Sequence, residues 1–335
     1  MCLMKKIIGL IFAVIMIMSV SVVTAGKFVY PEGQIETRVT FHNGSGWLVK
    51  NENWIFGDCN CRYDENGKFY IPMNYLKTYL GFSEAYRTKD GTAVYAKFGN
   101  VSIWQIIGSP SVSVNGVWYD DAPAYVDDYG TVMIPLDVYS YPAGFLYTAE
   151  TPEDYPEGKV SVSKSVSMNY SRVEVNKKMQ LVTVYGKDIT GQEVPVWYAV
   201  CSTGRLGQET IEGRYYLRPL TMGPSYHKWF FFPDSKIWIV NCVQINGGFC
   251  FHSVLFNNLF NPNSLVCASY YDLGKKATDG CVRLTVGDAA FVYDNCGGLP
   301  CDISSGYQND KLAELKEKLL AELPETAEEY IKGIS

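Results

Sequence analysis

Two short segments of the sequence carry residue types that could perform nucleophilic catalysis. They are Phe251-His252-Ser253 and Thr278-Asp279-Gly280-Cys281-Val282-Arg283-Leu284. A cysteine nucleophile needs a base that takes its proton and backbone amides that stabilise a developing oxyanion. His252 is the one histidine in a strand-like stretch of the second half, and Gly280 permits a sharp turn before Cys281. The two segments therefore predict thiol catalysis, with Cys281 as nucleophile and His252 as base.

Arg283 is predicted to hold the substrate. In an extended stretch it projects from the same face as Cys281, two positions earlier. A guanidinium there could bind a carboxylate through two hydrogen bonds and lower the pKa of the thiol. Other roles stay open: a structural salt bridge for Arg283, a disulfide for Cys281 and a core position for His252. Cys250 shares a strand face with His252, so it is a rival thiol or a redox partner of Cys281.

Short strands must position these residues. Strand-like runs at roughly ten-residue spacing, separated by Gly, Asn and Pro turns, predict a mainly β fold with a sandwich or barrel-like domain. The runs are Val173–Val175, Leu181–Tyr185, Val194–Cys201, Trp229–Phe232, Ile237–Val243 and Phe249–Val254. One helix is expected over residues 286–295. An amphipathic surface helix is expected over 311–323 and should end at Pro324.

With these residues in place, the second half resembles the L,D-transpeptidase (YkuD-type) catalytic domain, over about Val173 to Cys296. The resemblance includes Ser202-Thr203-Gly204 and Glu212-Gly213-Arg214-Tyr215 besides the two segments above. It implies that Cys281 is the nucleophile, that His252 is the general base and that the carbonyl of Ser253 orients the imidazole. It also implies that the amides around Gly280 and Cys281 form the oxyanion hole. The side chains implied to contact the substrate are Arg283, Asp279 and Thr278.

The sequence departs from the family's pattern in two ways. Asp279 stands where the family has a second histidine, a residue that supports the site more than it transfers protons. The 25 residues between His252 and Thr278 exceed the family's usual gap. We interpret the stretch Asn257–Asn263 as a loop insertion, which could form a lid that shapes the choice of acceptor.

Residues 27–165 contain an internal repeat. Phe69–Tyr75 with Gly81-Phe82 recurs as Val132–Val138 with Gly144-Phe145, and both the Ile-Pro and the Gly-Phe pairs are offset by 63 residues. A short helix is expected after each Ile-Pro. Repeated units of this kind predict a small α+β module.

This first half resembles the stalk domain that is named after the copper amine oxidase N-terminus, although its sequence holds no cluster of metal-ligand residues. We expect it to act as a spacer or a wall-facing module. Asn115-Gly116 between alternating residues predicts a hairpin. Residues 148–164 contain Pro152, Pro156, Gly158 and acidic residues, and we interpret them as the linker to the second half.

The first 25 residues have the layout of an export signal. Lys5 and Lys6 precede the apolar run Ile7–Val23, and Val23-Thr24-Ala25 supplies small residues for cleavage before Gly26. An uncleaved membrane anchor is the alternative, because 17 residues lie at the lower limit for a span. Either way we expect the rest of the chain to work outside the cytoplasm, secreted or in the cell wall.

Charge and composition exclude several classes of partner. The 335 residues include 29 Lys and Arg against 35 Asp and Glu, a net charge of −6, with no basic block. Binding of nucleic acid or of anionic membranes is therefore not expected. The ten cysteines form no C-x-x-C pair and there are three histidines, so neither a metal site nor a cofactor is predicted. Without Cys2 nine cysteines remain, an odd number, and Cys296 with Cys301 could close a disulfide loop.

We therefore expect a signal peptide (1–25), a repeated stalk-like domain (27–165), a catalytic domain (170–305) and a C-terminal amphipathic helix (307–335). The resemblance implies an exported enzyme of cell-wall biogenesis and cell shape that joins peptidoglycan stem peptides by 3→3 crosslinks through a cysteine acyl-enzyme. An L,D-carboxypeptidase that trims tetrapeptide stems and a non-catalytic wall-binding protein are the alternatives. The oligomeric state and the third residue of the stem stay open.

Overall fold

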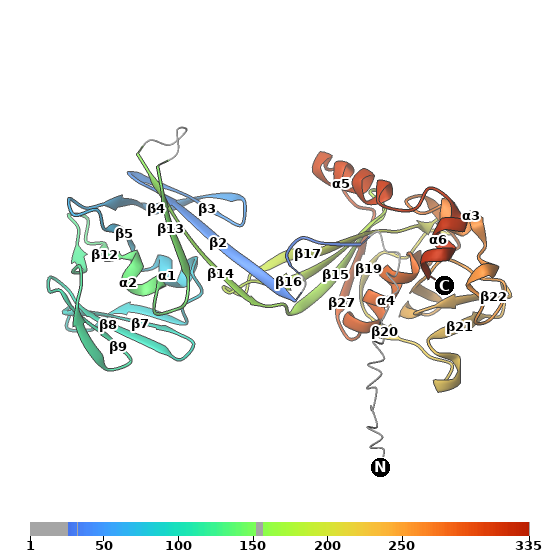
Figure 1. Cartoon of the computed structure of the whole chain (residues 1–335), viewed down its shortest axis with the longest axis horizontal. Helices are drawn as coiled ribbons and strands as arrows, with labels where there is room; N and C mark the ends of the chain where they lie inside the picture. The colour runs from blue at the N-terminus through green and yellow to red at the C-terminus, as the bar shows by residue number, and fades with distance from the viewer. Residues whose placement is uncertain (1–25, 32, 152–156, 335) are drawn as a thin grey trace, which may run out of the picture.

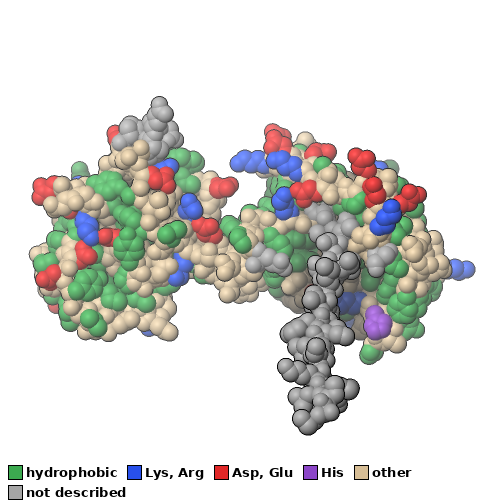
Figure 2. All heavy atoms as spheres, viewed as in Figure 1, with side chains coloured by type: hydrophobic (Ala, Val, Ile, Leu, Met, Phe, Trp, Pro, Cys, Tyr) green, Lys and Arg blue, Asp and Glu red, His purple; other side chains and the backbone are tan. Residues whose placement is uncertain are grey.

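The computed structural model describes residues 26–31, 33–151 and 157–334, so the predicted signal peptide lies outside the described residues. Strands dominate, as predicted, and the chain forms two lobes joined by a narrow waist (Figure 1). We call residues 34–167 the N-terminal lobe. Residues 170–334, together with strand β1 (Lys27–Phe28), form the C-terminal lobe. On the face shown in Figure 2, acidic and basic side chains are interspersed over both lobes.

The N-terminal lobe consists of two antiparallel sheets on a shared hydrophobic core. The eight-stranded sheet has the order β11 (Tyr125–Val126), β12 (Val132–Pro135), β5 (Phe69–Pro72), β4 (Asn53–Tyr63), β3 (Ser45–Lys50), β2 (Gln34–His42), β14 (Lys159–Ser167) and β13 (Leu146–Glu150). The five-stranded sheet has the order β10 (Val117–Asp120), β9 (Ser111–Val114), β8 (Val101–Ile106), β7 (Ala93–Phe98) and β6 (Glu84–Arg87).

The two copies of the repeat meet inside the eight-stranded sheet. Strands β5 and β12 pair antiparallel and place Ile71 directly opposite Ile134, and both side chains are fully buried. Each strand leads into a short helix, α1 (Tyr75–Thr78) or α2 (Leu136–Ser140), which confirms the helices predicted after the Ile-Pro pairs. The repeat is therefore a local two-fold arrangement whose apolar residues share one core.

Two predictions for the connections in this lobe had opposite outcomes. The hairpin at Asn115-Gly116 is confirmed, because β9 and β10 pair around it and both residues have positive φ angles. The linker predicted over 148–164 is wrong for the residues that the structure describes. Strands β13 and β14 pair along this stretch, and Val160 and Val162 are buried in the core. The alternation of Ser and Val is a strand signal that the neighbouring Pro and acidic residues obscured.

The C-terminal lobe is built from four further sheets. The six-stranded sheet has the order β1, β17 (Glu193–Val200), β16 (Leu181–Lys187), β15 (Tyr170–Asn176), β27 (Pro300–Ser304) and β19 (Gly213–Tyr216). The four-stranded sheet has the order β20 (Arg218–Pro219), β23 (Val243–Asn246), β24 (Phe249–His252) and β26 (Val282–Arg283). Two short pairs are β18 (Thr203–Gly204) with β25 (Lys276–Thr278), and β21 (Trp229–Phe232) with β22 (Ile237–Val240).

The core of this lobe lies between the six- and four-stranded sheets. Val173 and Val182 from the first sheet join Phe251 and Val282 from the second in one fully buried cluster. Burial of branched and aromatic side chains between two sheets is the arrangement expected of a β-sandwich, so the predicted fold class is confirmed.

Helices cover the edges of the C-terminal lobe. They are α3 (Cys267–Tyr271), α4 (Val286–Asn295), α5 (Asp310–Ala321) and α6 (Ala327–Ile334), with short 3-10 turns η1 (Pro224–Tyr226) and η2 (Pro262–Ser264). The helix predicted over 286–295 is confirmed, and Thr285 caps it. The amphipathic helix predicted over 311–323 is confirmed as α5, which ends before Pro324, whereas the second helix within 307–335, α6, was not predicted. Within the described ranges, none of these helices is both long and apolar enough to span a membrane.

The lobes touch through the loop between β16 and β17. The Lys50 Nζ lies 3.0 Å from the Asp188 carboxylate, and both side chains are buried. Gly81 has a positive φ angle, and a Cβ there would lie 2.3 Å from the carbonyl oxygen of Ile189. The contact therefore requires a glycine in the first repeat copy and holds the N-terminal lobe against this loop.

Candidate active site

Strands β24 and β26 bring the two predicted segments together. They pair in parallel, with Phe251 beside Val282 and His252 beside Arg283. Phe251 and Val282 point into the core, so the alternation of side chains places Cys250, His252, Cys281 and Arg283 on the opposite face. There Cys250 and Cys281 join a small apolar cluster with Cys242 and Ile239. The predicted nucleophile and base thus lie on one face of adjacent strands.

The orientation of His252 is fixed by its neighbour. Its Nδ1 lies 2.6 Å from the carbonyl oxygen of Ser253, and because a carbonyl can only accept, Nδ1 donates. The remaining nitrogen, Nε2, is then the unprotonated one in the neutral ring. The imidazole is buried, and the Phe232 ring meets it edge-on. The hydroxyl of Ser253 accepts a hydrogen bond from the Val240 amide, which ties the orienting residue to the neighbouring strand.

Cys281 is partly buried, and its neighbours shift the pKa of its thiol in opposite directions. A side-chain hydrogen bond with Cys250, together with burial, raises the pKa of Cys281 to about 12. A hydrogen bond with His252 and its charge act in the other direction and lower this pKa. The raised pKa means that the resting nucleophile is a neutral thiol, so His252 must take the proton as the sulfur attacks.

The turn before the nucleophile is held by Thr278. Its Oγ1 donates to the carbonyl of Cys281 at 2.6 Å and accepts from the amide of Gly280 at 3.2 Å. Gly280 has a φ of 115°, and a Cβ there would lie 2.6 Å from the Phe249 ring. A side chain at this position would therefore displace the turn.

Among the described residues, Gly280 donates its amide to Thr278, whereas the amides of Asp279 and Cys281 make no hydrogen bond. Of the amides that the sequence indicated for an oxyanion hole, that of Cys281 is therefore the one ready to donate. The Asp279 amide is a second available donor in the same turn.

Arg283 is a buried cation whose partners are sparse. Its backbone pairs with Ser202 in both directions at 2.8 Å, which anchors the strand. Its Nη1 lies 3.5 Å from the carbonyl of Ser269, its Nε has no hydrogen-bond partner, and it forms no ion pair within the described part of the chain. Burial lowers the pKa of Arg283, while the charge of Asp272 acts in the opposite direction. A guanidinium in this state can accept a carboxylate from a ligand.

Asp279 does not join Cys281 and His252 through any hydrogen bond among the described residues. Its carboxylate is exposed and lies 2.6 Å from the guanidinium of Arg205. The position that carries a second histidine in the family pattern is therefore an exposed ion pair in this chain. The predicted insertion folds as a loop around η2, where Phe260 packs edge-on against Trp229.

Two features of the site were missed from the sequence. Cys242 forms a side-chain hydrogen bond with Cys250, so that three thiols follow one another from Cys242 to Cys281. The Gly248 carbonyl lies 3.7 Å from the sulfur of Cys281. The Asn246-Gly247 turn is a hairpin signal that could have placed Cys242 near Cys250.

All nine cysteines in the described ranges are free thiols, so the disulfide considered between Cys296 and Cys301 is not formed. Both of these side chains are buried in the core of the C-terminal lobe. No group of three His, Cys, Asp or Glu side chains in the part of the chain that the structure describes could hold a metal ion.

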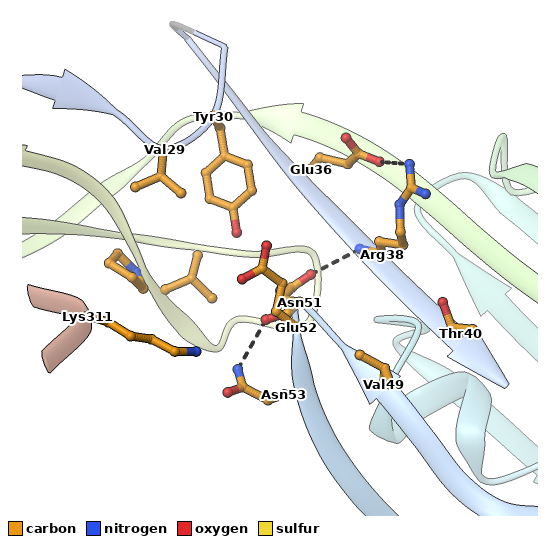
Figure 3. Close-up of a pocket in the computed structure, with 12 residues that line it drawn as sticks. Val29, Tyr30, Glu36, Arg38, Thr40, Val49, Asn51, Glu52, Asn53 and Lys311 are labelled. Carbon is orange, nitrogen blue, oxygen red and sulfur yellow. Dashed lines mark hydrogen bonds and ion pairs between the residues drawn. The ribbon is translucent and has the colours of Figure 1, made fainter. Parts of the chain in front are cut away.

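An open pocket of about 500 Å³ lies elsewhere, between the lobes. It is lined by residues of β2, of the turn after β3, and of β17, and Lys311 reaches it from α5 (Figure 3). Its lining includes neither a thiol nor an imidazole, so the pocket lacks the groups that the thiol chemistry needs.

Comparison with known proteins finds a family match over the residues that carry the site. Residues 170–304 match the YkuD family, described as the L,D-transpeptidase catalytic domain. A Bacillus subtilis (strain 168) protein that is provisionally named as an L,D-transpeptidase, YciB, is 25% identical over 155 residues, which are 44% of this chain and 72% of that protein.

Solved structures are similar at lower identity. A fused Zn-dependent amidase/peptidase/peptidoglycan-binding protein from Clostridium acetobutylicum ATCC 824 is 23% identical, covers 40% of this chain and 51% of its own, and has a TM-score of 0.29. L,D-transpeptidase 3 from Mycobacterium tuberculosis, in complex with a faropenem-derived adduct, is 16% identical, with coverage of 60% and 94% and a TM-score of 0.27. The chain spans about half of the first of these proteins.

Proposed function

We propose that the L,D-transpeptidase catalytic domain at residues 170–304 crosslinks peptidoglycan stem peptides through an acyl-enzyme on Cys281. The observation that carries this proposal is the pairing of Cys281 with an imidazole whose Nδ1 is held 2.6 Å from the Ser253 carbonyl. This arrangement leaves Nε2 of His252 to accept the thiol proton.

In the first step the sulfur of Cys281 attacks the carbonyl that joins the third stem residue to the terminal D-alanine. Nε2 of His252 takes the thiol proton, and the amides of Cys281 and Asp279 donate to the oxyanion. The tetrahedral adduct collapses, the C–N bond breaks, and the imidazolium returns its proton to the leaving amine. D-Alanine departs and a thioester remains on Cys281.

In the second step a side-chain amine on the third residue of a neighbouring stem attacks the thioester. The amine loses a proton to His252, the C–S bond breaks and the Cys281 thiol is restored, which leaves a 3→3 crosslink. Arg283 is proposed to bind a stem carboxylate, because it is buried without an ion pair among the described residues and lies on the same strand face as the nucleophile.

Water can replace the amine in the second step, which would make the protein an L,D-carboxypeptidase. The incomplete burial of Cys281 favours this as the second candidate, since a small nucleophile such as water needs little access to the thioester. The wall-binding alternative predicts no chemistry at all. We further propose that the chain is exported, acts at the cell wall and so influences cell shape, and that the N-terminal lobe is a stalk related to the copper amine oxidase N-terminal domain.

The decisive experiment incubates purified protein with tetrapeptide-stem peptidoglycan fragments and measures the products by mass. We expect free D-alanine together with crosslinked dimers. Tripeptide stems without dimers would indicate the carboxypeptidase. Cys281→Ala is the variant expected to be inactive. Cys201→Ala is the matched control that should keep its activity, because Cys201 is a buried thiol of the same lobe that belongs to a different cluster. Unchanged D-alanine release by Cys281→Ala would contradict the proposal.

Faropenem offers a test that needs no acceptor. The Mycobacterium tuberculosis L,D-transpeptidase 3 structure contains a faropenem-derived adduct. If Cys281 is an acylable nucleophile, the intact protein should gain the mass of such an adduct on the peptide that contains residue 281. A folded protein without any adduct would support the wall-binding alternative.

A further inference from the structure

Residues 26–29 belong to the C-terminal lobe, although they precede it by more than a hundred residues in the sequence. Strand β1 pairs with β17, with Lys27 beside Tyr198 and Phe28 beside Trp197. The Phe28 ring packs edge-on against Phe291 of α4, with ring centroids 5.5 Å apart. The chain therefore enters the structure at a fixed place on the edge of the six-stranded sheet.

Gly26 lies in a cradle that only glycine fits. A Cβ on this residue would lie 2.3 Å from the Trp197 ring and 2.4 Å from Oδ1 of Asp288. Approaches of this kind to a packed ring and a buried carboxylate leave no room for a side chain. The backbone nitrogen of Gly26 donates to Oδ1 of Asp288 at 2.7 Å.

Asp288 is an unusual partner for a backbone amide, because its side chain is fully buried. It lies in the first turn of α4, where Thr285 caps the helix. Its Oδ2 accepts from the Thr285 hydroxyl at 2.7 Å, and its own amide donates back to that hydroxyl. A helix N-terminus favours the negative charge, but a buried carboxylate is most stable beside a formal cation.

We infer that cleavage before Gly26 creates an α-ammonium group that pairs with the buried carboxylate of Asp288. The two supports are independent: the small residues Val23-Thr24-Ala25 precede Gly26 in the sequence, and the structure places the Gly26 nitrogen against Asp288. Hydrolysis of the Ala25–Gly26 peptide bond adds one water, leaving a carboxylate on Ala25 and the ammonium on Gly26. The inference rests on the export proposed above and not on the chemistry of Cys281.

The new charge would convert the hydrogen bond between the Gly26 amide and the Asp288 carboxylate into an ion pair in a buried setting, in which donor and acceptor both carry a charge. It would also fix the start of α4, which directly follows the strand that carries Arg283. Processing would thus complete the fold beside the active-site strand, and the uncleaved chain would lack this ion pair.

The first test identifies the N-terminus of the exported protein by mass and N-terminal sequencing. We expect Gly26 as the first residue. A chain that keeps its N-terminal segment, or that begins at another residue, overturns the inference whatever the activity of the protein.

The second test compares the thermal stability of chains that begin at Gly26, at Ala25, or at an N-acetylated Gly26. The free Gly26 ammonium should raise Tm by several degrees, on the order of 3–8 °C, over both other forms. An α-amino group has an ordinary pKa of about 8, and the carboxylate should raise this pKa. The advantage should therefore be full below pH 7 and disappear as the pH rises through the raised pKa. Equal Tm values for the three forms would overturn the inference.

Two substitutions test whether the stability difference depends on Asp288. Asp288→Asn should remove the difference between the Gly26 and Ala25 forms, because no charge remains for the ammonium. Glu322→Gln is the matched control, since Glu322 pairs with Lys27, the next residue, at the exposed surface. It should leave the difference intact. If Asp288→Asn fails to fold, the comparison with N-acetylated Gly26 still decides the matter.

Discussion

The C-terminal lobe contains two pairs of cysteines, and the surroundings of the two pairs differ. Cys250 and Cys281 lie on a strand face beside His252, and Cys281 is only partly buried. Cys296 and Cys301 lie within the core, where both are fully buried and burial raises the pKa of both thiols. The comparison teaches that a thiol becomes a candidate nucleophile through an oriented base and access to a substrate, since raised pKa values are common to both pairs.

The largest expected effect comes from removal of the base. His252→Gln should lower the rate of D-alanine release by roughly 10²–10⁴-fold, because the neutral thiol then has no group to take its proton. Steady-state kinetics on tetrapeptide stems measures this loss. Cys301→Ala should keep the rate within about twofold while lowering the free energy of unfolding by about 1–2 kcal/mol. Equal losses of rate in both variants would erase the proposed difference between the pairs.

Removal of the buried cation should have the next largest effect. Arg283→Met keeps the length of the side chain but not the charge, and we expect kcat/KM to fall by roughly 10–100-fold as a charge-assisted contact is lost. The comparison variant is Arg205→Met, because Arg205 is an exposed arginine close to the same turn. An Arg283→Met enzyme with normal kcat/KM would show that this residue has only a structural role.

The contact between Cys250 and Cys281 should itself be measurable. The hydrogen bond with Cys250 raises the pKa of Cys281, so Cys250→Ala should lower that pKa and increase the thiolate fraction. Each unit of pKa corresponds to about a tenfold change in alkylation rate at neutral pH. The pH profile of iodoacetamide labelling at residue 281 tests this. A profile that does not move towards lower pH would contradict the assigned contact.

The core pair should instead appear in the pH dependence of stability. Burial raises the pKa of Cys296 to about 12, so the folded thiol keeps its proton where the unfolded one, with a pKa near 8.5, has lost it. The unfolded state then binds fewer protons, and stability should fall as the pH rises above about 8.5, by up to about 1.4 kcal/mol per pH unit. Denaturant melts at pH 8 and 10 should show a smaller fall in Cys296→Ala than in the parent protein.

The smallest effect is expected at Asp279. Its ion pair with Arg205 is exposed, and such pairs contribute roughly 0–1 kcal/mol. Asp279→Asn should therefore change the rate of D-alanine release by less than about threefold, because a change in activation free energy of well below about 1 kcal/mol has an effect of this size. A loss comparable to that of His252→Gln would mean that Asp279 takes the role of the family's second histidine. The ion pair between Asp279 and Arg205 would then have to separate when substrate binds.

Local signals in the sequence predicted the elements well. The helix over residues 286–295 and the hairpin at Asn115-Gly116 were both predicted correctly, because each depends on a few adjacent residues. The 148–164 stretch was misjudged because its Pro and acidic residues outweighed the alternation that buries Val160 and Val162. The pairing of β1 with β17 could not be predicted from the sequence, since it joins residues that are far apart in the chain.

The candidate site was predictable where one motif contains its parts. Gly280, Cys281 and Arg283 are close in sequence, and family resemblance linked them to His252. The Cys242–Cys250 contact and the Arg205–Asp279 pair arise from strands and loops that meet only in the folded chain. Long-range packing decides these contacts, so a single sequence carries no direct signal for them.

The central claim is that Cys281, and not its neighbour Cys250, becomes acylated. Rapid acid quench of the protein with a tetrapeptide stem, followed by peptide mass mapping, measures it directly. The account predicts a thioester-linked tripeptide on the fragment that contains Cys281, absent in Cys281→Ala and present in Cys250→Ala. An adduct on Cys250, or turnover without any adduct in Cys281→Ala, would contradict it.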